Sequence, residues 1–134
     1  MKIDRLDHLV LTCADVERTV EFYERVLGMR PVTFGGDRRA LHFGRSKINL
    51  HQAGHEFEPK ATQPVPGSAD LCFILDGTLA EAVAHLAVSG VEILDGPVAR
   101  TGASGEMISV YFRDPDGNLI EVSEYTAERM VGGN

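Results

Sequence analysis

The stretch YFRDPDGNLIEV, residues 111–122, decides the fold of this chain. Apolar and polar residues alternate up to Arg113, which is the period of a half-buried strand. Residues 114–118, DPDGN, favour a turn, because Pro115 presets φ and Gly117 tolerates a positive φ. Alternation resumes after the turn, so the stretch predicts a strand, a tight turn and a second strand.

Glu121 lies in the middle of the second predicted strand, between Ile120 and Val122. A carboxylate in such a position is costly to bury unless another group pairs with it. This stretch alone leaves two interpretations open. Either the strand is at the edge of a sheet with Glu121 in water, or Glu121 faces inward and binds something.

The composition predicts one soluble domain over residues 1–134. The chain is 43% hydrophobic and 25% charged, as in an ordinary globular protein. Its net charge of −7 argues against a polyphosphate-binding surface, so we expect no nucleic acid partner. No apolar run is long enough to cross a membrane, and the start lacks a signal-peptide core. Two cysteines, Cys13 and Cys72, are typical of buried free thiols, so we expect a cytoplasmic protein without a membrane partner.

The order strand, helix, strand, strand, strand is predicted twice. Asp15 can cap the first helix, and Gly28 ends it. The first module, residues 4–53, has its expected strands at 6–13, 29–34, 39–43 and 47–52, and a loose connector at 54–68 follows it. The second module, residues 69–126, has an expected strand at 70–76, a helix at 79–88, a short strand at 91–94, a loop at 96–105 and the closing pair of strands.

An internal repeat relates the two modules, and it sets His8 against Asp70 and His51 against Glu121. Such a repeat implies two similar half-domains, each with a helix covering one face of its sheet. We therefore predict an α+β fold of two βαβββ modules. Their curled mixed sheets are expected to surround a cavity, with the helices on the outer face and the four ionisable side chains facing inward.

Four inward ionisable side chains are difficult to explain as packing. Two imidazoles and two carboxylates in one cavity either compensate one another or bind a single cation. Imidazole with carboxylate is a ligand set for divalent transition metals such as Zn, Fe(II), Mn, Ni or Co. The residues favour a metal site, with a metal-free polar cavity as the alternative.

Four motifs resemble the vicinal oxygen chelate superfamily, which includes glyoxalase I, extradiol dioxygenases and fosfomycin- and bleomycin-resistance proteins. The resemblance covers about residues 4–126 and is closest to single-domain proteins called glyoxalase domain-containing. It implies one divalent metal ion per site, with ligands on the first, fifth and eighth strands and sometimes a further ligand on the fourth. The motifs are LDHL at 6–9, TVEFY at 19–23, LGM at 27–29 and DPDGNLIE at 114–121, and the ligands carried over are His8, Asp70 and Glu121, with His51 as the fourth.

One residue departs from this family pattern. Asp70 occupies a position where glyoxalase I, extradiol dioxygenases and fosfomycin enzymes generally carry histidine. An oxygen-activating Fe(II) site needs two histidines and one carboxylate. Here only His8, His51 and Glu121 would supply that set, which makes the dioxygenase interpretation less favoured.

Two functional hypotheses follow from the resemblance. The first is a metal-dependent enzyme acting on a small oxygen-chelating substrate by lyase, isomerase or transferase chemistry, with Glu121 as general base. The alternative is a non-catalytic small-molecule binding protein of the bleomycin-resistance type, and an extradiol dioxygenase is a further alternative. We also expect a homodimer, because open curled sheets leave edges that need covering and relatives are commonly dimeric.

Five further polar residues are candidates for binding the small-molecule substrate. Asn49 shares a strand face with His51, and Tyr111 and Arg113 are expected on the cavity side of their strand. Lys60 and Arg100 are expected on loops that would close over an anionic ligand. Simpler roles remain open for these residues. Arg113 and Tyr111 would then cap the sheet edge, and Lys60 and Arg100 would be solvated charges on their loops.

Overall fold

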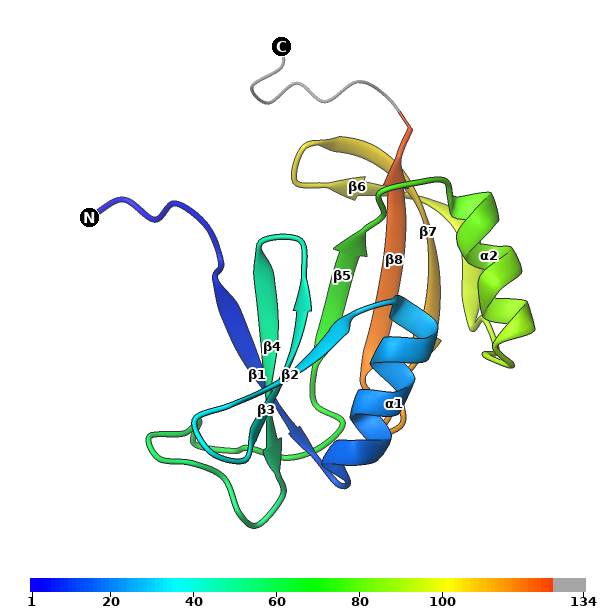
Figure 1. Ribbon diagram of the computed structural model, residues 1–134. Coiled ribbons are helices and arrows are strands. Elements are labelled where there is room, and N and C mark those ends of the chain that lie inside the picture. The colour runs from blue at the N-terminus through cyan, green and yellow to red at the C-terminus, as the bar shows by residue number, and fades with distance from the viewer. Residues whose placement is uncertain (127–134) are drawn as a thin grey trace. The chain divides into compact units, whose positions relative to one another are not determined.

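The computed structural model describes residues 1–126, which form two compact units. One unit contains residues 1–69 and 115–117, and the other contains residues 70–114 and 118–126. The elements, labelled in Figure 1, are β1 (His8–Cys13), α1 (Val16–Leu27), β2 (Arg30–Phe34), β3 (Arg38–Phe43), β4 (Ser46–Gln52), β5 (Asp70–Ile74), α2 (Leu79–Val88), β6 (Asp95–Gly102), β7 (Gly105–Arg113) and β8 (Leu119–Tyr125).

Each unit contains one four-stranded mixed sheet. The strand order is β1-β4-β3-β2 in the first sheet and β5-β8-β7-β6 in the second. In both sheets the first pair of strands is parallel and the other two pairs are antiparallel. The predicted α+β fold of two βαβββ modules is confirmed, and neither sheet is a closed barrel.

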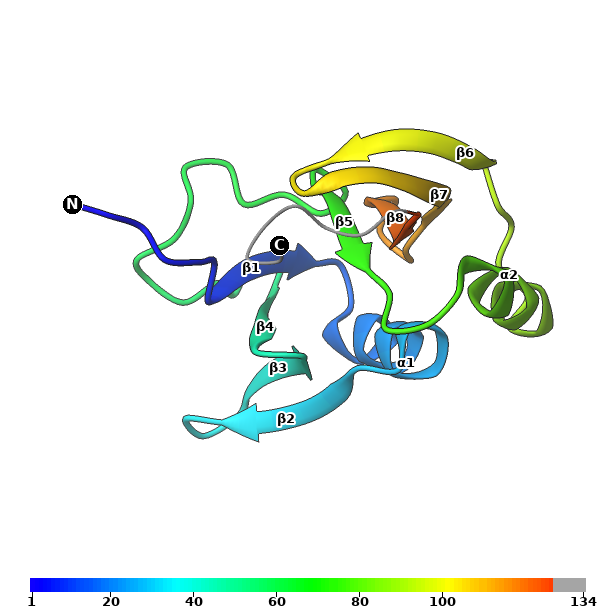
Figure 2. The same cartoon turned by 90° about the horizontal axis from the view of Figure 1, so that it is seen from above.

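The helix α1 begins and ends where its caps predict. The Asp15 side chain accepts a hydrogen bond from the Arg18 backbone N–H, and Gly28, at φ 68°, donates its N–H to the Glu24 carbonyl. Figure 2 shows α1 beside the strands of the first sheet. Its packed face consists of Thr19, Val20, Phe22, Tyr23 and Val26, all buried.

The helix α2 is fixed at its start by a capping box. The Thr78 side chain accepts from the Glu81 N–H, and the Glu81 carboxylate accepts from the Thr78 N–H. A second carboxylate, on β8, contributes as well, because Glu124 Oε1 accepts from the Leu79 N–H at 2.7 Å. These contacts satisfy helix N–H groups that have no partner inside the helix.

The turn that connects β7 to β8 is closed by a buried carboxylate. Asp114 is 5% exposed, and its Oδ1 and Oδ2 accept from the backbone N–H and side-chain amide of Asn118 at 2.9 and 2.7 Å. Asp116 belongs to the first unit, where its Oδ1 accepts from the Ala14 N–H at 3.2 Å. Gly117 has a φ of 87°, as the turn prediction requires.

The third strand of the second module was predicted in the wrong place. A strand was expected at residues 91–94 and a loop at 96–105, but β6 occupies Asp95–Gly102. Gly96 and Pro97 suggested a loop. Pro97 is tolerated because β6 is an edge strand, and its pairing with β7 shifts register between Asp95 and Val98.

The two cysteines differ from each other in exposure. Cys13 is buried as predicted, whereas Cys72 is exposed, so its prediction as a buried thiol was wrong. Cys72 lies on the edge strand β5, opposite Glu121 of β8. Among residues 1–126, no helix is long and apolar enough to span a membrane.

Candidate functional site

In the first unit, strand register places His8, Asn49 and His51 on one face of the sheet. His8 pairs with Lys47, Val10 with Asn49, and Thr12 with His51. The opposite face carries Ile48 and Leu50, which are buried with the α1 side chains. The three residues therefore share one face of the sheet, as predicted.

This arrangement does not bring His8 and His51 together. Four residues separate their positions along the parallel β1–β4 pair, which corresponds to about 13 Å at about 3.3 Å per residue. The repeat alignment is also shifted. Because Asp70 pairs with Leu119 as His8 pairs with Lys47, the counterpart of Glu121 is Asn49, and the predicted equivalence of His51 with Glu121 is wrong by two residues.

In the second unit, four of the predicted residues line one cavity. The cavity has a volume of about 460 Å³. Asp70 comes from β5, Arg100 from β6, Tyr111 from β7 and Glu121 from β8, so every strand of the sheet contributes one of them. Leu94, Asp95 and Leu119 complete the lining.

Arg100 and Tyr111 are linked across this cavity. Arg100 Nε donates to the Tyr111 hydroxyl at 2.9 Å, and this bond raises the pKa of Arg100. Arg100 also lies 3.6 Å from Asp95, a residue that the sequence did not single out. Since the Tyr111 oxygen accepts from Arg100, its own O–H is oriented to donate elsewhere.

The Glu121 carboxylate is hydrogen-bonded to one of two buried serine hydroxyl groups that lie side by side. Ser123 Oγ donates to Glu121 Oε2 at 3.2 Å and lies 2.6 Å from Ser109 Oγ, and both serines are fully buried. The Cys72 thiol lies 3.4 Å from the same Ser123 oxygen, and although Cys72 as a whole is exposed, the partial desolvation of its thiol raises the pKa of that group. In the sequence each serine stands next to a valine of its strand, Ser109 before Val110 and Ser123 after Val122. This pattern of a small polar residue beside an apolar one is the signal that could have revealed the two serines.

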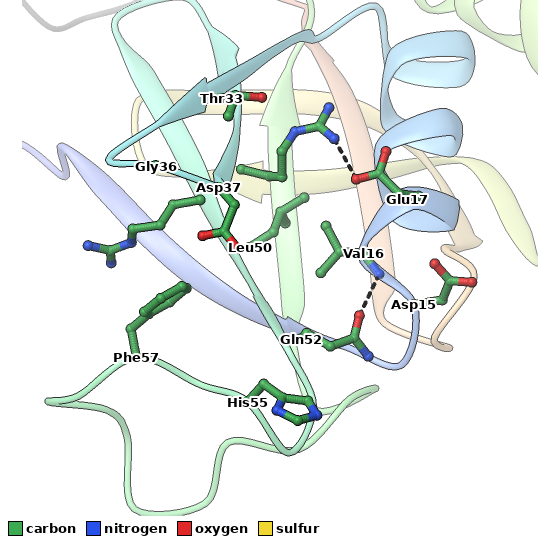
Figure 3. A pocket seen from close by; sticks show the side chains of 12 residues that line it. Asp15, Val16, Glu17, Thr33, Gly36, Asp37, Leu50, Gln52, His55 and Phe57 are labelled. Atoms are coloured by element: carbon green, nitrogen blue, oxygen red, sulfur yellow. Dashed lines mark hydrogen bonds and ion pairs between the residues drawn. The ribbon is translucent and has the colours of Figure 1, made fainter.

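A second cavity, of about 540 Å³, lies in the first unit near the start of α1. Figure 3 shows Asp37 and Phe57 on one side of it and Val16 and Glu17 on the other. The Arg39 guanidinium forms an ion pair with Glu17, and Gln52 Oε1 accepts from the Val16 N–H at 3.1 Å. None of the predicted site residues lines this cavity.

Two predicted substrate-binding cations lie away from both cavities. Lys60 is in the connector, where it lies 3.1 Å from Glu58 and 3.6 Å from Glu56. The hydrogen bond that the Lys60 ammonium donates to the Glu58 carboxylate raises the pKa of Lys60, so the charge of Lys60 is already balanced locally. Arg113 is exposed at the end of β7, on the Glu121 face by register, and it does not line the cavity of the second unit.

His51 is held as a neutral imidazole. It is 5% exposed, and its ring packs edge-to-face on Phe57 at 5.4 Å. Burial lowers the pKa of His51, and the positive charge of Arg38 lowers it further. The fold therefore disfavours the protonated form.

The depressed pKa predicts a stability loss in acid. Below pH ~6.5 the unfolded chain takes up a proton that folded His51 resists, so the free energy of unfolding should fall with pH, by at most about 1.4 kcal/mol per unit. Denaturant unfolding of metal-free protein between pH 7.5 and 5.5 checks this. His51→Gln should flatten the slope, whereas His55→Gln, which removes an exposed imidazole, should keep it. Equal slopes for the parent and His51→Gln would contradict the expectation.

No three His, Cys, Asp or Glu residues cluster closely enough within the described chain to hold a metal ion. The side chains that each unit offers, carboxylates in one and an imidazole in the other, are nevertheless of types that bind divalent transition metals. In the second unit, the Asp70 and Glu121 carboxylates line one cavity. In the first, His8 Nδ1 lies 2.8 Å from the Asp7 carboxylate, which is the contact that usually orients a metal-binding imidazole through its other nitrogen.

Comparison with known proteins identifies the family. A family model described as the glyoxalase/bleomycin resistance protein/dioxygenase superfamily matches residues 5–122. The chain is 58% identical over 125 residues to virulence protein STM3117 of Salmonella typhimurium, covering 93% of this chain and 87% of that protein. The crystal structure of STM3117 superposes with a TM-score of 0.93, covering 94% of this chain and 100% of the other.

Two further relatives extend the comparison. Glyoxalase domain-containing protein RDO1 of Mycosarcoma maydis is 55% identical over 125 residues, covering 93% of this chain and 70% of that protein. Metallothiol transferase FosB of Shouchella clausii is 25% identical over 131 residues, covering 96% and 86%. From the matched residues, the repeated βαβββ topology and these similarities, the chain belongs to the glyoxalase/bleomycin resistance protein/dioxygenase superfamily.

Proposed function

We propose that this protein is a metal-dependent enzyme that acts on a small oxygen-chelating substrate by lyase, isomerase or transferase chemistry. Asp70 and Glu121 are the proposed carboxylate ligands, and His8 is the imidazole ligand that the family resemblance supplies. His51, which the strand register separates from His8 by about 13 Å, is left out of this ligand set. When bound, the cation would stabilise negative charge that develops on the substrate oxygens.

The observation that carries this proposal is the cavity of the second unit. Asp70 and Glu121 line the same cavity, and within residues 1–126 neither carboxylate lies within 4.0 Å of a basic nitrogen. Two such charges in one cavity repel each other, and a dication relieves that repulsion. The name of the relative FosB, metallothiol transferase, is consistent with metal-dependent chemistry in this family.

The other residues of the cavity have separate proposed roles. The Arg100 guanidinium would bind an anionic oxygen of the substrate, and the Tyr111 hydroxyl, fixed by Arg100, would donate a hydrogen bond to it. Glu121 would accept a proton from the substrate, and Ser123 would hold the carboxylate in the orientation that this needs. Leu94 and Leu119 would exclude water from the reacting atoms.

The proposal is tested by the metal dependence of turnover. Protein stripped of metal and then reloaded with Mn(II), Zn, Ni, Co or Fe(II) is assayed on panels of α-hydroxy-ketones, catechols and epoxides. We expect turnover of one panel by reloaded protein alone, and a loss of about tenfold or more in Tyr111→Phe, which keeps both carboxylates. Saturable ligand binding without turnover, equal with and without metal, would favour the non-catalytic binding protein instead.

A homodimer is part of the same proposal. Ile3 is 77% exposed, Leu6 66% and Val10 46%, and all three lie on or just before β1, which is an edge strand. Exposed apolar side chains beside an open strand edge favour pairing with another chain. Light scattering at micromolar concentration should give the mass of two chains, and a monomer mass would count against the dimer.

A further inference from the structure

Two positive charges on the His8 face of the first sheet have no carboxylate partner. Arg38 lies on β3 and Lys47 on β4, and both are half-buried. Within residues 1–126, neither cation lies within 4.0 Å of a carboxylate oxygen. The Asp7 carboxylate lies close enough to Lys47 for an electrostatic interaction, but the hydrogen-bond partner of this carboxylate is His8, at 2.8 Å.

Aromatic rings hold both cations in place without neutralising them. The Lys47 ammonium lies 4.3 Å from the centre of the Phe34 ring, and the Arg38 guanidinium carbon lies 5.2 Å from the same ring. Arg38 also lies 4.5 Å from the Phe57 ring, which packs on His51. Such contacts stabilise the position of a cation and leave its full charge available to an anion.

Between these cations the sheet presents an unused hydrogen-bond acceptor. Asn49 pairs with Ala40 of β3, two residues along the strands from the pairing of Lys47 with His42. The Asn49 side chain is 8% exposed, and its Oδ1 is buried with no hydrogen-bond partner. Buried polar atoms are nearly always satisfied, so this oxygen points to a donor that the protein itself does not supply.

We propose that this face of the first unit binds the anionic group of a small molecule through Arg38 and Lys47, with Asn49 accepting a hydrogen bond from the same molecule. The anionic group is a carboxylate or a phosphate, and the donor is a hydroxyl or an amide N–H. Arg38 supplies the fork that binds such groups in a bidentate manner, and Lys47 supplies a point charge.

The position of this site connects it with the proposed enzyme. Lys47 is the register partner of His8, so the proposed anion site and the proposed imidazole ligand lie on the same face of the first sheet. If the proposed function is correct, the substrate carries this anionic group, so carboxylated or phosphorylated members of the assay panels should be turned over in preference to neutral ones. Only this identification of the ligand as the substrate rests on the proposed function, because anion binding itself needs no metal.

The test is an NMR titration of metal-stripped, 15N-labelled protein at constant ionic strength. The probes are inorganic phosphate and malonate, with neutral malonamide as the control ligand. We expect saturable shifts of the Arg38 Nε–H and the Asn49 side-chain amide with at least one anion and none with malonamide. Whichever anion binds more tightly identifies the group as phosphate or carboxylate.

Four substitutions decide whether the two cations form the site. Arg38→Met and Lys47→Met should each weaken anion binding by about tenfold or more. Arg45→Met removes the same charge from the exposed turn between β3 and β4 and should leave the affinity within about twofold. Arg38→Lys keeps the charge but loses the bidentate fork, so its affinity should lie between those of the parent and Arg38→Met, and it provides the test if Arg38→Met proves unstable.

Several outcomes would overturn this site. Shifts that grow linearly without saturation, or an equal loss in Arg45→Met and Lys47→Met, would show only general electrostatic attraction. The results also separate this proposal from the enzyme proposal. Anion binding that survives while the protein fails to bind metal would refute the enzyme alone, and metal binding without anion binding would refute this site alone.

Discussion

Replacing Glu121 with alanine should remove most of the divalent metal that the protein binds. Glu121 lines the same cavity as Asp70, and the variant leaves one carboxylate there instead of two. Loss of an outer partner of a ligand typically costs about 10–100-fold in affinity, so loss of a ligand itself should exceed about 100-fold. Metal content after gel filtration, and the affinity measured by calorimetry, give the readout.

The matched control is Glu92→Ala, which removes an exposed carboxylate outside the cavity. This variant should bind as much metal as the parent. Both variants should remain folded, because Glu121 is only half-buried, and unfolding curves will establish this. Parental metal content in Glu121→Ala would show that Glu121 is not a ligand.

Replacing Asp114 with alanine should destabilise the fold by about 3 kcal/mol or more. The variant leaves the buried backbone N–H and side-chain amide of Asn118 without their charged acceptor, and hydrogen bonds to charged groups contribute about 1.5–3 kcal/mol each. The denaturation midpoint should fall while the denaturant slope stays unchanged.

Two further variants make this measurement specific. Asp114→Asn keeps one acceptor oxygen and should lose less stability than Asp114→Ala. Asp37→Ala removes an exposed carboxylate from the turn between β2 and β3, and its effect should stay within about 0.5 kcal/mol. If Asp114→Ala and Asp37→Ala have equal effects, the Asp114–Asn118 contact does not stabilise the turn as described.

The helices were predictable because their ends carry explicit chemical signals. Asp15 and Gly28 bracket α1, and the predicted bounds of α2, residues 79–88, match the structure. β6 was missed because Gly96 and Pro97 resemble a loop, and the sequence does not reveal that the strand lies at a sheet edge where proline is tolerated. Local patterns therefore located capped elements better than irregular strands.

The site was only partly predictable. Asp70, Arg100, Tyr111 and Glu121 were chosen separately from the sequence, and the sheet brings all four to one cavity. The repeat alignment was shifted by two residues because the β3–β4 turn and the β7–β8 turn differ in length, and this difference concealed the match of Asn49 with Glu121.

The positions of Arg38 and Lys47 on Phe34 could not be predicted. They depend on how far long side chains reach across the sheet, and strand periodicity carries no information about that reach. The sequence therefore located the carboxylates more readily than the cations.

Calorimetric titration of the stripped parental protein with divalent metals near neutral pH tests the central claim most directly. We expect one of Zn, Mn, Ni, Co or Fe(II) to bind with a stoichiometry of one ion per chain. The affinity should decrease as the pH falls through the histidine range, because protons compete for the imidazole and carboxylate ligands. Absence of saturable binding for all five metals would contradict the metal site, and the cavity of Asp70 and Glu121 would then have to bind an organic ligand without a metal.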